Sequence, residues 1–256
     1  MDVSWTLEGK VAIVTGASRG GIGEAYAHAL SDAGARVVCA DINLDGARAV
    51  AEAIDGNGSE ALSVAVDIAD ESSVEAMVDA TVTRFGGVDI LVNNAALMVQ
   101  IVTTSAMDFE RGDWDRAFSV NVTGAWQCAK AVVPSMRERG GGRIVNQASV
   151  GAFPAESVYG ITKLAIVGLT TTLARELGPA NITVNCIAPG ITASDAGTQL
   201  TPVGSAYREM VEQRAALRAV GQPGELCGAL LLFCAPAGGW ITGQVLNIDG
   251  GLIMRP

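Results

Sequence analysis

The 256-residue chain is long enough to build one large hydrophobic core, and its composition excludes several classes of protein. Hydrophobic residues make up 49% and charged residues 17%, which is typical of a globular protein with fully buried strands or a large subunit interface. A net charge of −10 argues against a nucleic-acid or anionic-membrane partner. The first ten residues lack the features of a signal peptide, and the longest apolar run, Ala229 to Ala235, is too short to span a bilayer. We therefore expect a cytoplasmic protein.

The cysteine and histidine content argues against metal and triad chemistry. Five widely spaced cysteines form no CxxC pair, so we expect them to be reduced and mostly buried, with no metal site and no disulfide scaffold. His28 is the single histidine and lies on a predicted helix far from the other candidate groups. A Ser-His-Asp triad is therefore excluded at the site described below.

Short apolar segments alternate with longer segments of helical spacing along the whole chain. Such alternation indicates a parallel sheet with both faces covered. We expect a single domain over residues 1–256, of the α/β class, with a Rossmann-type doubly wound parallel sheet of about seven strands and helices on both faces. The predicted strands are Val11–Val14, Arg36–Ala40, Leu62–Val66, Ile90–Val92, Arg143–Asn146, Thr183–Ile187 and Val245–Ile248. The predicted helices include Glu24–Asp32, Val74–Phe85, Asp113–Met136 and Val158–Leu177.

One stretch departs from this alternation. Residues Gly190 to Gly204 are rich in Thr, Ser, Gly and Pro, and a polar segment of helical spacing, Ala206 to Leu217, follows them. Long loops in compact domains are usually functional or disordered. We expect a substrate loop near residues 190–217.

A glycine-rich turn follows the first predicted strand and leads into a helix. The turn reads Thr15-Gly-Ala-Ser-Arg-Gly-Gly-Ile-Gly23. Glycines let the backbone approach a pyrophosphate, whose charge is met by the unpaired N–H groups of the helix N-terminus. Its position between a strand and a helix predicts a dinucleotide site.

An acidic residue ends the second predicted strand. Asp41 lies 18 residues beyond Gly23, where a carboxylate accepts hydrogen bonds from the adenosine ribose and repels a 2′-phosphate. This position favours NAD over NADP. Arg19 favours NADP, since a guanidinium can bind a phosphate, but the position of Asp41 is the more discriminating of the two.

Polar residues recur at the ends of the next strands. Asp67-Ile68 ends the third strand and Asn93-Asn94-Ala95-Ala96 the fourth. Either segment alone could be a simple turn. Because the carboxyl ends of parallel strands meet at one edge, their recurrence favours a shared ligand.

A tyrosine and a lysine form the candidate catalytic pair. Gln147-Ala148-Ser149 ends the fifth strand, and Tyr159 and Lys163 follow it, four residues apart on one helix face. Lowering a phenol pKa by about 3 units from about 10 requires roughly 4 kcal/mol, part of which an adjacent ammonium can supply. Such a tyrosine can act as a general base toward an alcohol or as a general acid toward a carbonyl.

Over nearly its whole length the chain resembles the classical short-chain dehydrogenase/reductase family. The motifs that carry the resemblance are the Thr15–Gly23 turn, Asn93–Ala96, Asn121, Ser149, the Tyr159–Lys163 pair and Pro189-Gly190. Their combination is far more specific than any one of them. The resemblance implies an NAD-linked oxidoreductase acting on a secondary alcohol or ketone, in a homotetramer or homodimer.

The resemblance also implies a role for each matching residue. Tyr159 would exchange a proton with the substrate oxygen, Lys163 would hold the nicotinamide ribose and lower the tyrosine pKa, Ser149 would bind the substrate oxygen, and Asn121 would hold a relay water. The implied cofactor-binding residues are Gly16, Ser18, Arg19, Gly21, Ile22, Gly23, Asp41, Asp67, Ile68, Asn94, Ala95, Tyr159, Lys163, Pro189, Gly190, Thr192 and Ser194.

Four departures from the family pattern affect these expectations. The glycine turn has one residue more than the usual TGxxxGxG. Ala96 and Ser194 replace a usual glycine and threonine, and the interval from Ser149 to Tyr159 is about three residues shorter than is common. None of the four removes a catalytic group, but the pyrophosphate contacts cannot be assigned residue by residue.

Two alternative functions compete with the NAD-linked dehydrogenase. One is an NADPH-dependent carbonyl reductase of the 3-oxoacyl type, which Asp41 disfavours. The other is a non-catalytic NAD-binding regulatory protein, which the intact set of catalytic residues disfavours. The expected pocket segments contain apolar residues such as Met98, Val99 and Phe153 and few basic ones, so we expect an uncharged or partly apolar substrate rather than a phosphorylated one.

Overall fold

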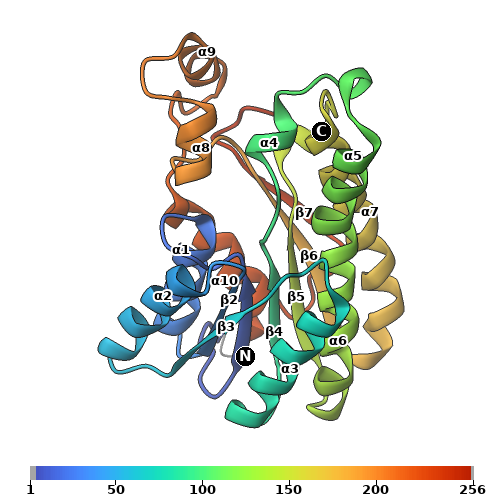
Figure 1. Cartoon of the computed structure of the whole chain (residues 1–256). Helices are drawn as coiled ribbons and strands as arrows, with labels where there is room; N and C mark the ends of the chain where they lie inside the picture. Colours follow the sequence, from blue (N-terminus) through green and yellow to red (C-terminus); the bar gives the residue numbers. More distant parts are fainter. Residues whose placement is uncertain (1–3, 255–256) are drawn as a thin grey trace.

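The computed structural model describes residues 4–254, which form a seven-stranded parallel sheet with helices on both faces (Figure 1). The strand order is β3-β2-β1-β4-β5-β6-β7. This confirms the predicted doubly wound α/β fold. The strands are β1 (Val11–Thr15), β2 (Arg36–Asp41), β3 (Ala61–Ala65), β4 (Ile90–Asn93), β5 (Gly142–Gln147), β6 (Ile182–Pro189) and β7 (Val245–Ile248).

The strand order reverses at β1, which pairs with β2 on one side and β4 on the other. Val14 of β1 is in register with Cys39 of β2 and Val92 of β4. Because the chain leaves the sheet in opposite directions from β1 and β4, a crevice opens beyond their carboxyl ends. This crevice is where the fold predicts a ligand.

Longer helices cover both faces of the sheet, and shorter ones extend its carboxyl edge. The helices are α1 (Ile22–Asp32), α2 (Leu44–Gly56), α3 (Glu71–Phe85), α4 (Val99–Val102), α5 (Arg111–Phe118), α6 (Ala125–Glu138), α7 (Val158–Leu177), α8 (Asp195–Leu200), α9 (Ala206–Arg214) and α10 (Cys227–Cys234). Short 3₁₀ turns are Ala106–Asp108, Val150–Ala152, Gly178–Ala180, Pro223–Leu226 and Pro236–Gly238. In Figure 1, α8 and α9 project from the body of the domain at one end of the sheet.

Most strand positions are apolar because successive side chains enter two different cores. Ala12 and Val14 of β1 pack in a cluster with α1, α2 and α10, whereas Val11 and Ile13 pack in a cluster with α3, α6 and α7. Side chains alternate between the two faces of a strand, so a strand buried on both faces has few polar positions. This explains the continuous apolar runs in the sequence.

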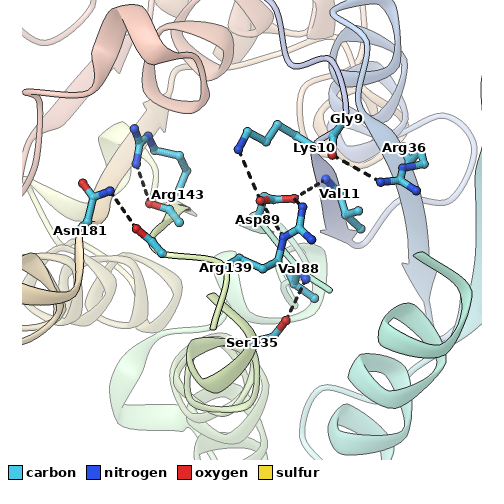
Figure 2. A network of polar contacts seen from close by, with 12 residues as sticks. Gly9, Lys10, Val11, Arg36, Val88, Asp89, Ser135, Arg139, Arg143 and Asn181 are labelled. Atoms are coloured by element: carbon cyan, nitrogen blue, oxygen red, sulfur yellow. Dashed lines mark hydrogen bonds and ion pairs between the residues drawn. The ribbon is translucent and has the colours of Figure 1, made fainter. Parts of the chain in front are cut away.

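An ion-pair network closes the amino ends of the central strands (Figure 2). The buried Asp89 carboxylate accepts hydrogen bonds from Nε and Nη2 of Arg139 at 2.9 and 2.8 Å and from the Val11 N–H at 2.9 Å. Lys10 Nζ lies 3.6 Å from the same carboxylate. Nearby, the Val88 N–H donates to Ser135 Oγ at 3.0 Å. The network ties β1 and β4 to the end of α6.

The predicted helix Asp113–Met136 is wrong in one respect: it is not continuous. A π-helical segment, Ser119–Gly124, separates α5 from α6. A π-turn adds one residue to a helical turn without changing the polarity of the sequence, so a search for a 3.6-residue period does not detect it. The segment places Asn121 in the interior.

The segment Gly190–Gly204, expected as a long loop, contains the short helix α8 (Asp195–Leu200). Ser194 caps this helix by accepting a hydrogen bond from the Gly197 N–H at 3.2 Å. The following polar helix, expected over Ala206–Leu217, ends at Arg214. Within residues 4–254, no helix combines the length and apolar character that a membrane span requires.

Candidate active site

The carboxyl ends of β1 to β4 surround a cavity of about 570 Å³. Five of the predicted cofactor residues line it: Gly16, Asp41, Asp67, Ile68 and Ala95. The cavity also has walls that sequence reasoning did not assign to the cofactor: Ile42, Val66, Ala69, Ala96, Leu97, Asp115, Arg116, Ser119 and Val120. The last four come from α5 and the π-segment, which no strand-end pattern indicates.

The glycine turn makes a cradle that side chains would fill. Gly16 has a φ of +68°, and a Cβ there would lie 2.8 Å from the backbone of Ala95. A Cβ on Gly23 would collide with the Gly16 carbonyl oxygen. Gly21 precedes α1 without a side-chain cap, so the first N–H groups of the helix have no intrahelical acceptor. A pyrophosphate fits this arrangement.

Asn94 joins the end of β4 to this turn. Its Nδ2 donates to the carbonyl oxygens of Thr15 and Gly16, both at 2.9 Å. Its Oδ1 accepts from Gln147 Nε2 at 2.9 Å. The N–H groups of Asn94 and Ala95 donate to Thr15 Oγ1 at 3.1 and 3.2 Å. The second asparagine of the motif therefore fixes the floor of the cradle.

The extra residue of the turn is accommodated at Gly20. The Gly20 N–H donates to Glu24 Oε2 at 2.7 Å, and its carbonyl oxygen accepts from the Asp195 N–H at 2.9 Å. Gly20 has a φ of +82°, and a Cβ there would collide with the Asp195 carboxylate. The turn therefore contacts the start of α8, a contact between residues far apart in the sequence.

Asp41 lies where the sequence predicts the discriminating carboxylate. Its Oδ2 accepts from the Ser18 N–H at 3.0 Å and its Oδ1 from the Asn43 N–H at 2.8 Å. These bonds hold a largely buried carboxylate at the wall of the cavity. A carboxylate so placed fits ribose hydroxyls and repels an added phosphate.

Asp67 and Ile68 form a fixed edge of the same cavity. Asp67 Oδ1 accepts from the Ala69 N–H at 2.9 Å, and the Ile68 carbonyl accepts from Gln127 Nε2 at 2.8 Å. Ile68 is buried and packs close to Gly124 of the π-segment. The pair supplies an apolar wall beside a polar edge, which suits a purine base.

The structure brings Ser149, Tyr159 and Lys163 together. The Tyr159 phenol is hydrogen-bonded to the Ser149 side chain. Lys163 Nζ lies 5.6 Å from the centroid of the Tyr159 ring and donates to the Gln147 carbonyl at 2.8 Å. The Ser149 Oγ also accepts from the Gly151 N–H at 3.1 Å. Helix α7 and the end of β5 thus hold a phenol, a hydroxyl and an ammonium at one place.

Burial controls the protonation of this group. Burial raises the pKa of the Tyr159 phenol well above its usual value, and the hydrogen bond with Ser149 offsets only part of that rise. Burial also lowers the pKa of Lys163 from its usual 10.5 to about 8. The expected lowering of the tyrosine pKa by the ammonium is not seen here, because desolvation of the phenolate is the dominant effect.

Asn121 reaches both the cavity wall and α7. Its Oδ1 accepts from the Leu97 N–H at 2.7 Å, and its Nδ2 donates to the Leu97 carbonyl at 2.9 Å and to Thr162 Oγ1 at 3.1 Å. The side chain thus clamps the segment after β4 to the helix that carries Tyr159. The relay water predicted for Asn121 stays a prediction.

The end of β6 is tightly packed and leads into α8. The Gly190 N–H donates to the Ile248 carbonyl at 2.9 Å, and a Cβ there would lie 2.8 Å from the backbone of Asp249. Thr192 Oγ1 donates to the Gly190 carbonyl at 3.2 Å. Thr192 and Ser194 are both buried, and Ser194 caps α8. Their predicted contact with the cofactor carboxamide stays a prediction.

Two further departures from the family pattern, Ala96 and the short interval between Ser149 and Tyr159, are explained by the local backbone. The non-glycine residues with positive φ in the described chain are Ala155, Asn181 and Arg218, so Ala96 needs no glycine-like conformation. The shortened interval between Ser149 and Tyr159 contains Ala155, with a φ of +50°. A Cβ on Gly160 would lie 2.6 Å from the Gly151 carbonyl oxygen, so this loop is pressed onto α7.

Most of the cysteines are buried, and Cys186 partly offsets the lowering of the Lys163 pKa. Cys39, Cys128, Cys186 and Cys234 are buried, and Cys227 is partly buried. Burial raises the pKa of Cys39, Cys128 and Cys234 to about 12. No cluster of three or more metal-binding side chains occurs among residues 4–254. The burial agrees with the prediction of mostly buried cysteines, and their reduced state stays a prediction.

Comparisons with known proteins identify the family of this chain. A family model described as "Enoyl-(Acyl carrier protein) reductase" matches residues 16–253. An uncharacterized oxidoreductase of Mycobacterium tuberculosis is 47% identical over 253 residues, which cover 97% of this chain and 99% of the relative. The chain belongs to the short-chain dehydrogenase/reductase family.

Two solved structures of similar fold contain nicotinamide cofactors. A 7α-hydroxysteroid dehydrogenase in complex with NADH and 7-oxo glycochenodeoxycholic acid is 36% identical, with a TM-score of 0.88 over 96% of this chain and 95% of its own. A gluconate 5-dehydrogenase from Burkholderia cenocepacia in complex with NADP and tartrate is 32% identical, with a TM-score of 0.91 over 98% and 97% of the two chains. The family relationship makes this chain an oxidoreductase and leaves the choice of cofactor to the residues of its own cavity.

Proposed function

We propose that this oxidoreductase transfers a hydride between NAD(H) and a secondary alcohol or ketone, with Tyr159 as the general acid and base. The observation that carries the proposal is the contact of the Tyr159 phenol with Ser149, beside the ammonium of Lys163. A nicotinamide, when bound, supplies or accepts the hydride. The cradle at Gly16 and Gly23 and the carboxylate of Asp41 fit such a dinucleotide.

The side chains around Tyr159 are suited to moving a proton. Ser149 can donate a hydrogen bond to a carbonyl oxygen and so hold it near the phenol. Because burial keeps the phenol protonated, Tyr159 rests as a proton donor, ready to protonate the oxygen of a ketone. In the oxidation of an alcohol, the hydroxyl proton of the substrate must pass to the Tyr159 phenolate. The adjacent Lys163 ammonium stabilises the phenolate that accepts it.

Asp41 supports NAD as the preferred cofactor. Two backbone N–H groups fix both oxygens of its carboxylate, so it cannot swing away to admit a 2′-phosphate without losing them. The NADPH-linked reductase is the second candidate. Arg19 in the glycine turn favours it, because its guanidinium forms no ion pair with any residue between 4 and 254.

The surroundings of Tyr159 support an apolar substrate. A cluster beside it contains Ile101 and Val158, with Leu97, Phe109 and Trp114 packed against them. Phe109 and Trp114 were not predicted as pocket residues. Such walls favour an uncharged, partly apolar ketone or alcohol over a phosphorylated one.

Replacement of Tyr159 by phenylalanine tests the proposal. We expect Tyr159→Phe to lower kcat with NAD and a secondary alcohol by at least 10²-fold, because the proton-transfer group is lost. The Kd for NADH, followed by nicotinamide fluorescence, should stay within threefold of the wild type. Substantial turnover by the variant would refute the role of Tyr159, and tighter binding of NADPH than of NADH would refute the role of Asp41.

A further inference from the structure

The cavity at the carboxyl edge has one cationic side chain in its wall, and no motif accounts for it. Arg116 of α5 lines the cavity together with three carboxylates, Asp41, Asp67 and Asp115. Its guanidinium makes no ion pair or side-chain hydrogen bond with any residue in the described part of the chain. Unpaired guanidinium groups at the wall of an anion-binding cavity are candidates for ligand contacts.

The nearest carboxylate on the same helix is already neutralised. Asp115 accepts hydrogen bonds from Arg111 Nε at 2.8 and 2.7 Å, one to each oxygen. Arg111 and Asp115 are four residues apart, so this pair lies along one face of α5. Arg116 follows Asp115 directly, and both residues line the cavity, but only the Asp115 carboxylate already has an ion-pair partner on the helix.

The position of Arg116 relative to the apolar wall suggests what it binds. Val120 lies one helical turn further along, and it lines the cavity with Ile68. Ile42 borders the same cavity and is 75% exposed to solvent. An apolar side chain and an unpaired guanidinium are thus left at the mouth of one cavity, where a flat, uncharged ring would cover both.

From this geometry we infer that the Arg116 guanidinium packs against the adenine ring of the cofactor and thereby determines part of its affinity. The inference rests on the proposed use of a nicotinamide dinucleotide and deepens it. Guanidinium planes stack on aromatic rings, and this contact does not require a phosphate. Asp41 occupies the ribose position with fixed carboxylate oxygens, so the 2′ side is closed to an anion that Arg116 could otherwise hold. The adenine ring therefore remains as the partner of the Arg116 guanidinium.

Binding of adenine-containing ligands tests the inference without reference to turnover. The full-length wild type, Arg116→Gln and Arg116→Lys are titrated with NADH by fluorescence, and AMP and adenosine are measured as competitors. Arg111→Gln is the matched control, because it removes an exposed guanidinium from the same helix. We expect Arg116→Gln to raise the Kd for all three ligands by about three- to fivefold, which is the size of a partly exposed guanidinium–ring contact.

Arg116→Lys separates stacking from charge. We expect it to lose as much affinity as Arg116→Gln, because an ammonium keeps the charge and lacks the plane. Arg111→Gln should stay within 1.5-fold of the wild type, at the level of an exposed ion pair.

Each other outcome overturns the inference. Unchanged affinity in Arg116→Gln would show that the guanidinium does not touch the ligand. Full affinity in Arg116→Lys, or a loss seen with AMP and not with adenosine, would assign it to a phosphate. If the wild type bound neither NADH nor AMP, both the proposed function and the inference would fail. If the wild type bound NADH and Arg116→Gln bound it equally well, only the inference would fail.

Discussion

The two ends of the central strands differ in how fully their charged side chains are paired within the protein. At the amino ends, the carboxylate of Asp89 meets Arg139, Lys10 and a backbone N–H, so its hydrogen-bonding capacity is used within the protein (Figure 2). At the carboxyl ends, Arg116 makes no ion pair with any other residue of the range 4–254, and the wall carries three carboxylates. The amino end is built for stability, whereas the carboxyl end keeps binding capacity for a ligand at some cost to stability.

The largest effect on folding is expected at the amino end. Asp89→Ala should lower the free energy of unfolding by about 3 kcal/mol, because it leaves a partly buried guanidinium and a buried N–H without their acceptor. Urea unfolding followed by circular dichroism measures this.

Glu60→Gln, which breaks an exposed pair with Arg84, is the control and should cost less than 1 kcal/mol. Affinity for NADH per folded molecule should be unchanged in Asp89→Ala. A loss of cofactor affinity would show that the two ends are not independent.

A smaller effect is expected from pH at the carboxyl end. The pKa of Lys163 is lowered to about 8, so its ammonium is present below that pH and is lost above it. Reduction of a ketone should therefore fall by up to tenfold per pH unit above about 8, because the ammonium that stabilises the phenolate formed by proton transfer disappears.

The profile of kcat/KM between pH 6 and 10 measures this titration. Controls at each pH should confirm that NADH remains intact and that the protein remains folded. A profile that stays flat to pH 10 would contradict the assigned role of Lys163.

The smallest effect is expected at the strained loop before α7. Ala155 has a φ of +50°, a conformation that glycine adopts at less cost than alanine. Ala155→Gly should raise the free energy of unfolding by about 0.5 kcal/mol, since relief of strain is partly offset by the greater freedom of the unfolded chain. Thermal unfolding measures the shift.

Asn181→Gly is the matched case away from the site, since Asn181 also has a positive φ of +57° and lies in the turn before β6. It should be destabilised, because it loses the hydrogen bond from its Nδ2 to the Gly140 carbonyl at 3.0 Å. Equal responses of the two sites would contradict the idea that Ala155 holds strain without a compensating contact.

Residues at the ends of strands could be predicted from the sequence, and residues on the walls of the cavity could not. Asp41 and Asn94 follow apolar strands directly, so a parallel sheet places them at one edge whatever the detailed packing. Arg116 and Val120 reach the same cavity through the angle at which α5 and the π-segment cross that edge. That angle depends on a single inserted residue in the helix, which leaves no trace in polarity or spacing.

Contacts between segments far apart in the chain could not be predicted from the sequence either. Lys163 was expected beside a ribose, and its bond to the Gln147 carbonyl depends on how far α7 sits from the end of β5. The contact of Gly20 with Asp195 joins segments about 175 residues apart. The rise in the Tyr159 pKa depends on burial, which residue identity alone does not determine.

The lengthened glycine turn shows how a motif of this kind can change its length and keep the close glycine contacts between its two ends. The added backbone unit at Gly20 uses its N–H on Glu24 and its carbonyl on the Asp195 N–H, and neither partner belongs to the cradle formed by Gly16 and Gly23. An insertion is tolerated where the new peptide group finds partners outside the ligand's reach. Motif searches that require a fixed spacing will therefore miss chains whose binding geometry is intact, and glycine contacts across the turn are a better criterion than residue counts.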